Sequence, residues 1–328
     1  MKVNLIFRHF IYLLFTSLLF ISCEDKEILI EVEDNKFPEL GSDGPYIADQ
    51  KYSGVNNYIE YYSGNLPVII AAPHGGAMMP IEIPDRTAGT MATDKNTKEL
   101  SKAVMNVLKS NFGSRPHVII NNLDRKKMDA NREVNEATQG NVFAKRAWDE
   151  YHHYINSAKN KILEKYSYGL YLDIHGHGVN PDGFYDLRIW LGYLLSGNEL
   201  DKTDDELNNG PYQSKSSINK LTEISSENFT QVLRGDNSFG NILDNLGYPC
   251  LPSINDPSPE GMRYFSGGYN TSKYGSAETG SKISSIQIEL PLPDIRENSI
   301  QWNNFGEALS TTLEKYFKKH YNINNLGQ

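Results

Sequence analysis

Residues 169–178 read Gly-Leu-Tyr-Leu-Asp-Ile-His-Gly-His-Gly, and residues 67–76 read Pro-Val-Ile-Ile-Ala-Ala-Pro-His-Gly-Gly. Both stretches begin with apolar and β-branched residues in a run too short for a helix, which is typical of a buried strand. Each run ends at a histidine followed by glycine, a residue that permits a tight turn and a close approach. In an open α/β sheet, ligands bind beyond the carboxyl ends of the strands. The two stretches therefore predict a sheet that brings His74 and His175 together at one edge.

The rest of the chain alternates between strand-like and helix-like patterns. Two further apolar runs predict strands, at 117–123 and 283–290. Apolar residues that recur every three or four positions predict helices at 94–112, 141–166, 226–246 and 299–320. Residues 183–224 are less regular and predict an excursion over the site. This alternation predicts an α/β fold, a three-layer sandwich with a mostly parallel or mixed central sheet.

Length, composition and charge are those of a globular protein with a large core. The chain has 328 residues, of which 39% are hydrophobic and 11% aromatic, and a chain of this length can bury a large α/β core. Its formal net charge is −9, which disfavours nucleic acid as a partner on electrostatic grounds.

The first 23 residues have the features of a bacterial lipoprotein signal peptide. Lys2 and Arg8 give a basic start, an apolar stretch follows at 10–21, and Cys23 stands where such proteins carry their lipid. The apolar stretch is too short to span a membrane comfortably. An ordinary signal peptide with a chance cysteine is the alternative. We expect an exported lipoprotein, periplasmic or at the outer membrane or cell surface, held to the membrane only through the lipid on Cys23.

These patterns divide the chain into three parts. A signal peptide covers 1–23, an acidic tether covers 24–45, and a single catalytic α/β domain covers 46–328. Glutamate and aspartate dominate the tether, which predicts a solvated spacer. Cys250 is then the one thiol of the mature chain, so the sequence predicts no intramolecular disulfide.

The two strand-end histidines predict a metal site, and zinc (Zn²⁺) suits them because it binds histidine nitrogen together with carboxylate oxygen. His74 and His175 are the expected ligands. The third ligand is a carboxylate or His177, and the acidic candidates are Glu82, Asp85 and Asp94. Asp94 opens a predicted helix, so an N-cap is its alternative role.

Asp173 precedes His175 by two residues, so both side chains point to the same face of a strand. A carboxylate in that position can hold the ring of a ligand histidine from behind. A buried ion pair is the competing role for Asp173.

Two further features carry groups that hydrolases use. Residues 123–132, Leu-Asp-Arg-Lys-Lys-Met-Asp-Ala-Asn-Arg, follow a predicted strand and are rich in groups that bind carboxylates. An exposed charge cluster is the alternative for this run. Glu289 lies inside an apolar strand, where a carboxylate without a partner is costly. Beside a metal it suits a general base, and a structural ion pair is the alternative.

In this order the motifs resemble the N-formylglutamate amidohydrolase (N-formylglutamate deformylase) family, which is related in fold to the zinc carboxypeptidases and to succinylglutamate desuccinylase. The resemblance runs through residues 73–76, 94, 124–132, 151–152, 173–175, 267–275 and 286–289. Each motif is short, but their order makes the set more specific. The resemblance implies a sandwich like that of the zinc carboxypeptidases and the phosphorylase/hydrolase-like folds.

The resemblance also implies a role for each matching residue. The zinc ligands would be His74, His175 and Asp94. The catalytic residues would be Glu289 as general base and Arg125 as a contact to the oxyanion or substrate. The substrate-binding residues would be Asn131 and Arg132, which would hold a terminal carboxylate, and the loop residues Gly267, Gly268 and Tyr274. His177 would support the ligands or face the substrate.

Two departures from the family pattern concern the substrate. Tyr269 and Ser272 stand where the family has histidine and arginine, and Gly176-His177 stands where it has serine and an apolar residue. We therefore expect a zinc-dependent amidohydrolase whose substrate is an N-acyl amino acid or small peptide with a carboxylate. One alternative is a cell-wall amidase or peptidase of the muramoyl-alanine type, which export favours. The other is a non-catalytic binding lipoprotein, which the 20 tyrosines suggest.

Overall fold

The computed structural model describes residues 36–178, 183, 185–277 and 281–327. The predicted signal peptide, Cys23 included, lies outside these residues, and one compact unit begins at Phe37. Among the described helices, none is long and apolar enough to cross a membrane. The strands of the sheet are β1 (Lys51–Ser53), β2 (Ile59–Tyr62), β3 (Val68–Ala72), β4 (His117–Asn121), β5 (Gly169–His177), β6 (Ile189–Gly192), β7 (Cys250–Leu251) and β8 (Ile283–Pro291).

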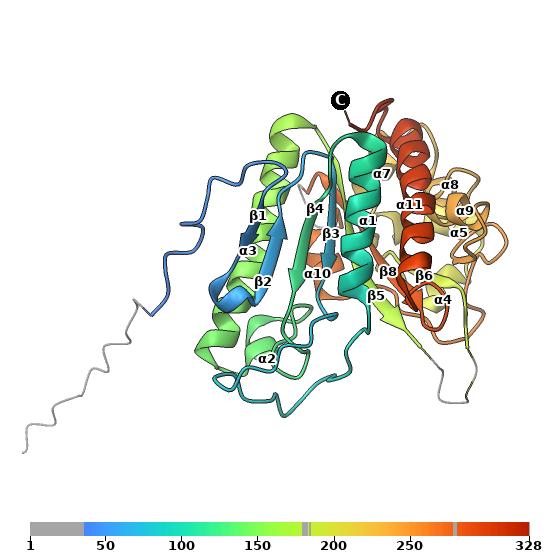
Figure 1. Ribbon diagram of the computed structural model, residues 1–328. Coiled ribbons are helices and arrows are strands. Elements are labelled where there is room, and N and C mark those ends of the chain that lie inside the picture. Colours follow the sequence, from blue (N-terminus) through green and yellow to red (C-terminus); the bar gives the residue numbers. More distant parts are fainter. Residues whose placement is uncertain (1–35, 179–182, 184, 278–280, 328) are drawn as a thin grey trace, which may run out of the picture. The chain divides into compact units, whose positions relative to one another are not determined.

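These eight strands form a mixed sheet in the order β1-β2-β4-β3-β5-β8-β6-β7 (Figure 1). The four central strands, β4, β3, β5 and β8, run parallel to one another. On either side, β2 pairs antiparallel with β4, and β6 pairs antiparallel with β8. The carboxyl ends of the parallel strands therefore meet at one edge, where the sequence predicts the site.

Helices cover both faces of this sheet and make it the middle of three layers. Residues Val68, Ile70 and Ala72 of β3 belong to the core on the face covered by α1 (Thr97–Phe112) and α11 (Ser299–His320). The alternate residues, Ile69 and Ala71, belong to the core beneath α3 (Val142–Lys165). Because successive strand residues face opposite ways, the apolar run at 67–72 fills both cores. The predicted three-layer α/β sandwich is confirmed.

The predicted helix at 226–246 is wrong as a single element. The structure has two short helices there, α8 (Phe229–Arg234) and α9 (Phe239–Asp244). Gly235 ends α8 in an extended conformation, and the Ser238 hydroxyl accepts from the Asn241 N–H at the start of α9. A continuous apolar pattern therefore hides a break that a glycine and a capping serine create.

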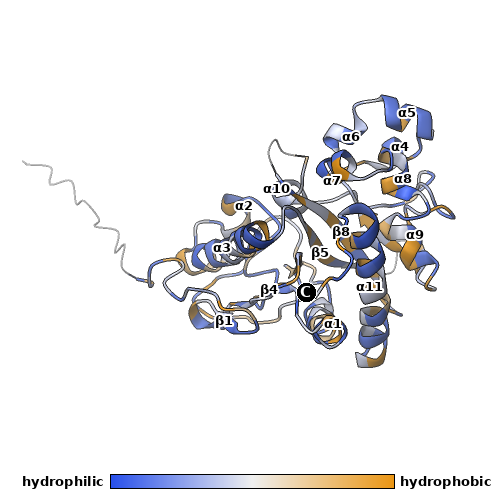
Figure 2. Ribbon diagram, turned by 90° about the horizontal axis from the view of Figure 1, so that it is seen from above, coloured by the Kyte–Doolittle hydropathy of each residue, from blue (hydrophilic) through white to orange (hydrophobic). Residues whose placement is uncertain are grey.

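Between β6 and β7 the chain makes a long helical excursion, in the region whose pattern was irregular. Figures 1 and 2 show these short helices at the end of the sheet far from β1. The remaining elements are the 3-10 helix η1 (Val55–Asn57) and the helices α2 (Val134–Thr138), α4 (Gly197–Leu200), α5 (Asp204–Asn209), α6 (Tyr212–Lys215), α7 (Asn219–Ile224) and α10 (Tyr269–Tyr274).

The described part of the acidic segment packs onto the domain. Asp43 accepts hydrogen bonds from the hydroxyls of Tyr46, at 2.7 Å, and of Tyr154 on α3, at 2.8 Å. Burial and the Asp43 carboxylate together raise the pKa of both phenols well above their ordinary value. Residues from 37 onward therefore belong to the compact unit.

Gly76, two residues after His74, lies close to the backbone that follows β4. A Cβ at this position would lie 2.3 Å from the carbonyl carbon of Asn122 and 2.5 Å from the carbonyl oxygen of Leu123. Neither atom can move without shifting the loop. We expect Gly76→Ala to lower the free energy of unfolding by at least about 2 kcal/mol in urea titrations.

Gly178 provides the matched control for this substitution. A Cβ there would meet its nearest neighbour, the Leu292 carbonyl oxygen, at an ordinary 3.8 Å. Gly178→Ala should change the unfolding free energy by less than about 0.5 kcal/mol. Equal losses in the two variants would contradict the packing argument.

Candidate active site

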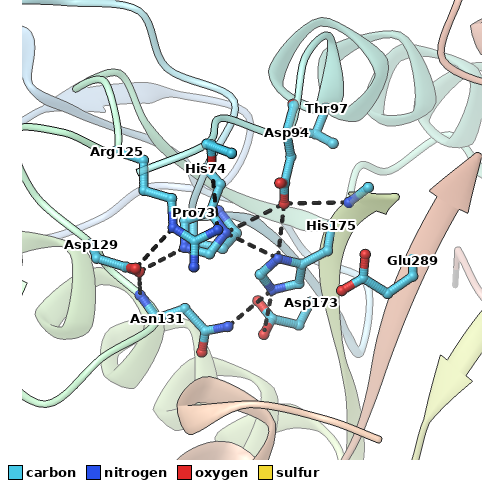
Figure 3. A network of polar contacts seen from close by, with 12 residues as sticks. Pro73, His74, Asp94, Thr97, Arg125, Asp129, Asn131, Asp173, His175 and Glu289 are labelled. Atoms are coloured by element: carbon cyan, nitrogen blue, oxygen red, sulfur yellow. Dashed lines mark hydrogen bonds and ion pairs between the residues drawn. The ribbon is translucent and has the colours of Figure 1, made fainter. Parts of the chain in front are cut away.

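The ends of three parallel strands and two loops bring a group of polar residues together (Figure 3). His74 follows β3, His175 lies on β5, and Glu289 lies on β8 in register with His175. The loop before α1 supplies Asp94. The loop after β4 supplies Arg125, Asp129 and Asn131.

Three of these residues point one ligand atom each at a common centre. The Nδ1 atoms of His74 and His175 are 3.1 Å apart. Oδ2 of Asp94 lies 3.3 Å from Nδ1 of His74 and 3.1 Å from Nδ1 of His175. A tetrahedral zinc ion, with bonds of about 2.0–2.1 Å, separates its ligand atoms by about 3.3 Å. The three atoms therefore form a triangle of the size that such an ion requires.

A buried carboxylate lies behind each histidine ring. Nε2 of His74 is 2.6 Å from Oδ1 of Asp129, and Nε2 of His175 is 3.1 Å from Oδ2 of Asp173. Both carboxylates are fully buried. Each favours a proton on the Nε2 atom that faces it, which leaves the opposite Nδ1 with a bare lone pair.

In this arrangement two imidazole Nδ1 atoms and one carboxylate oxygen converge on one point. Atoms that carry lone pairs or negative charge repel at such distances unless a shared proton or a metal cation lies among them. The donor set of two imidazoles and one carboxylate is the set typical of catalytic zinc, and it leaves a fourth position open. The residues present therefore fit a divalent metal ion of the zinc class. Among the described residues, this is the group of histidines and acids with metal-binding geometry.

The electrostatics of the site also favour a positive charge at its centre. Burial disfavours protonated His175, but the negative charges of Asp173 and Asp94 outweigh burial and raise the pKa of His175 well above its ordinary value. Burial alone would raise the pKa of Asp94, yet its hydrogen bonds to His175 and His74 lower the pKa below the ordinary range. A bound metal ion supplies the same positive charge that the proton does.

Glu289 is a buried carboxyl group on the wall of the same cleft. Burial is the main cause that raises its pKa to about 7, with the charge of Asp94 adding to it and that of His175 opposing it. Its Oε1 accepts a hydrogen bond from Nε2 of Gln287 at 2.9 Å. A carboxyl group that gains and loses its proton near neutral pH is suited to proton transfer.

The cleft over these groups has a volume of about 640 Å³ and is mainly cationic. Its charged lining residues are the bases Lys95, Arg125, Arg132, Arg263 and Arg296 and the acids Asp94 and Glu289. An excess of cations attracts anionic ligands such as carboxylates. Arg296 is largely occupied, because it donates to the carbonyl oxygens of Leu290, Lys95 and His177.

The structure separates the four candidates for the third ligand. Asp94 lies with the two histidines, and its carboxylate does not cap α1, whose N-cap residue is Asn96. Glu82 accepts a hydrogen bond from the Tyr58 hydroxyl, and Asp85 pairs with Lys127 at 2.8 Å. His177 lies on the cleft wall and stacks on Trp190, with ring centroids 4.0 Å apart.

The predicted substrate-binding residues fall into two groups. Arg132, Gly267 and Gly268 line the cleft. Asn131 also lines it, and its Oδ1 accepts from the Asn270 N–H at 2.8 Å.

Tyr274 lies apart from the described cleft lining. Its side chain is buried, and its hydroxyl contacts Nδ1 of His152 on α3. It contributes to the core beneath the site, where its ring lies 5.3 Å from that of Tyr171.

Asp129 is a site residue to which the sequence pattern assigned no role. It accepts from Nε2 of His74, from Nε of Arg125 at 2.9 Å and from the Asn131 N–H at 3.0 Å. The sequence does place Asp129 four residues after Arg125, in a segment rich in groups that bind carboxylates, and this spacing could have indicated the pair. The same contact turns Arg125 toward the metal-binding group, so Arg125 and His74 share one carboxylate.

No protein-family model matches the chain, and no curated protein matches it significantly. Several solved structures show distant similarity. The N-formylglutamate amidohydrolase from Ralstonia eutropha JMP134 aligns with 81% of this chain and 99% of its own length, at 14% identity and a TM-score of 0.48. The catalytic domain of CwlV, an N-acetylmuramoyl-L-alanine amidase from Bacillus (Paenibacillus) polymyxa, aligns with 77% of this chain and 98% of its own, at 11% identity and a TM-score of 0.34. Similarities at this level assign neither a family nor an activity to the chain.

Asp129→Asn tests the carboxylate behind His74. The amide cannot hold the Nε2 proton as a carboxylate does, so the Nδ1 atom becomes a weaker ligand. We expect zinc affinity, measured by competition with a chromogenic chelator, to fall about 10- to 100-fold. Asp149→Asn is the control, because Asp149 pairs with Lys145 on α3, outside the cleft lining. Equal zinc affinity in both variants would contradict a role for Asp129 in holding the ligand.

The raised pKa of His175 also predicts how zinc binding depends on pH. An empty site with this pKa holds a proton at neutral pH, and the metal must displace it. Apparent zinc affinity should therefore fall as pH falls, by about tenfold per unit for one displaced proton. Chelator competition at pH 6, 7 and 8 measures the slope. Affinity that is constant over this range would show that no proton competes for the site.

Proposed function

We propose that the protein is a zinc-dependent hydrolase that cleaves the amide bond of an N-acyl amino acid or small peptide-like substrate bearing a carboxylate. One observation carries the proposal: the metal-binding group of His74, Asp94 and His175 shares a cleft with the buried carboxyl group of Glu289. A structural metal site has no need of a buried, ionisable carboxyl group at its side.

The residues of this chain would divide the reaction among them. When bound by His74, Asp94 and His175, zinc supplies Lewis-acid chemistry, which polarises a carbonyl group and makes water more acidic. Glu289 accepts the proton of the attacking water and later gives it to the leaving amine. Arg125 lies on the cleft wall and donates toward the oxygen that gains negative charge.

The cationic lining supports a substrate with a carboxylate. Arg132 is half-exposed in the cleft, where its Nε donates to Glu136 and one Nη1 hydrogen goes to the Asn131 carbonyl oxygen. Its other guanidinium hydrogens are suited to a carboxylate, for which arginine has a matching fork of donors. Export as a lipoprotein anchored at Cys23 remains part of the proposal and rests on the N-terminal sequence alone.

Glu289→Gln separates proton transfer from metal binding. The amide has nearly the same shape but cannot accept a proton, so kcat should fall at least about 100-fold on the best substrate of an N-acyl amino acid panel. Zinc content, measured by mass spectrometry after purification without chelators, should remain one ion per chain.

Glu297→Gln is the matched control, because Glu297 lies exposed on the loop after β8. Its activity should equal that of the parent protein. If Glu289→Gln hydrolyses amides at the parent rate, the general base lies elsewhere. If the parent protein hydrolyses purified peptidoglycan but no N-acyl amino acid, the cell-wall amidase replaces the proposed function.

A further inference from the structure

We propose that His177 is a specificity-determining residue that accepts a hydrogen bond from an N–H or O–H group on the acyl part of the substrate. This inference rests on the proposed function and narrows it. It assigns the enzyme to substrates whose acyl group is larger than formyl and carries a donor, as peptidyl and hydroxyacyl groups do.

The hydrogen bonds of His177 fix which of its nitrogen atoms carries the proton. Nε2 lies 2.9 Å from the backbone carbonyl oxygen of Arg188, which can only accept. Nε2 is therefore the protonated nitrogen, and Nδ1 carries a lone pair.

Nδ1 of His177 is a buried acceptor without a partner among the described residues. The residue is only 4% exposed and lines the cleft. Nδ1 itself is closed to solvent in the empty cleft, so a donor reaches it only when neighbouring lining residues move as the substrate binds. A buried polar atom left without a hydrogen bond destabilises the protein. A donor that arrives with the substrate removes this penalty, and the site then discriminates strongly against analogues that lack the donor.

The surroundings of His177 hold its ring in one position. The indole of Trp190 stacks on it almost in parallel, with an interplanar angle of 4°. The Trp190 Nε1–H donates to Asp186 at 3.1 Å, and Asp186 is held in turn by Arg188 at 2.7 Å. An acceptor fixed in this way selects for the geometry of a donor as well as for its presence.

The order of the strands indicates which end of the substrate His177 meets. Arg125 and Arg132 follow β4 on one side of the metal-binding group, whereas Trp190 lies on β6 beyond Glu289 on the other side. If the arginines hold the carboxylate of the amino acid, the acyl group extends toward His177. A formyl group carries no N–H or O–H and would leave Nδ1 without a partner.

Two pairs of substrates test this, each made on the amino acid that the enzyme hydrolyses best. N-Glycolyl and N-acetyl derivatives differ by one hydroxyl, and N-acetylglycyl and acetoxyacetyl derivatives differ by one N–H. For the zinc-loaded parent protein, we expect kcat/KM to favour the donor-bearing member at least tenfold in one pair. In His177→Gln, whose amide can still reach the Arg188 carbonyl, this ratio should fall below about threefold. In His177→Asn, whose amide lies near the position of Nδ1, most of the preference should remain.

Because both members of a pair are measured on the same variant, a general loss of stability or activity cancels in the ratio. A parent protein without preference in either pair, or a preference that survives unchanged in His177→Gln, overturns the inference. If the parent hydrolyses none of these amides, the proposed function fails separately. Binding of the same pairs, measured by calorimetry, then tests the hydrogen bond to His177. Equal affinities within each pair overturn the inference.

Discussion

The geometry of the site depends on two buried carboxylates that lie behind the histidine rings. Asp129 and Asp173 each face an Nε2 atom, so the Nδ1 lone pairs of His74 and His175 turn toward each other and toward Asp94. This convergence is unfavourable without a shared proton or a metal cation, and the fold tolerates it because the sheet and its loops fix every partner. Two glycines allow this close packing. A Cβ at Gly76 would collide with the backbone after β4, and a Cβ at Gly176 would collide with the Arg296 guanidinium.

The fold could be predicted where the sequence pattern is strong. Val68–Ala72 is wholly apolar and Ile283–Pro291 alternates apolar with polar residues over most of its length; both patterns indicate strands, and both strands are buried on both sides. The outer strands β1, β6 and β7 have two to four residues, which is too few to show a periodic pattern. Their pairing is set by contacts with distant parts of the chain, as between Trp190 and Glu289, which a local pattern does not contain.

Some residues of the site could likewise be predicted from the local sequence, and others are determined by contacts between distant parts of the chain. His74, His175 and Glu289 were predictable because a histidine at a strand end and an acid inside a strand are local anomalies. Asp94 had two equal roles in the sequence, and only the packing of its loop against His74 and Gly176 directs its carboxylate inward. Asp129 and Tyr274 show the two kinds of error. Asp129 stands among other charged residues in the sequence, so no pattern distinguishes it. Tyr274 belongs to a loop motif of the expected site, but its side chain is buried in the core.

The two ends of the cleft offer different hydrogen-bonding groups, and the order of the strands determines which group lies at which end. Its β4 side presents guanidinium donors, while the opposite side presents the Nδ1 acceptor of His177, whose ring stacks on Trp190 of β6. A ligand that satisfies both ends must carry an acceptor or anion at one end and a donor at the other. A peptide-like chain has this polarity in every residue, since each amide combines a carbonyl oxygen with an N–H. The metal-binding group and Glu289 lie between the two ends, where the scissile bond of such a chain would come to rest.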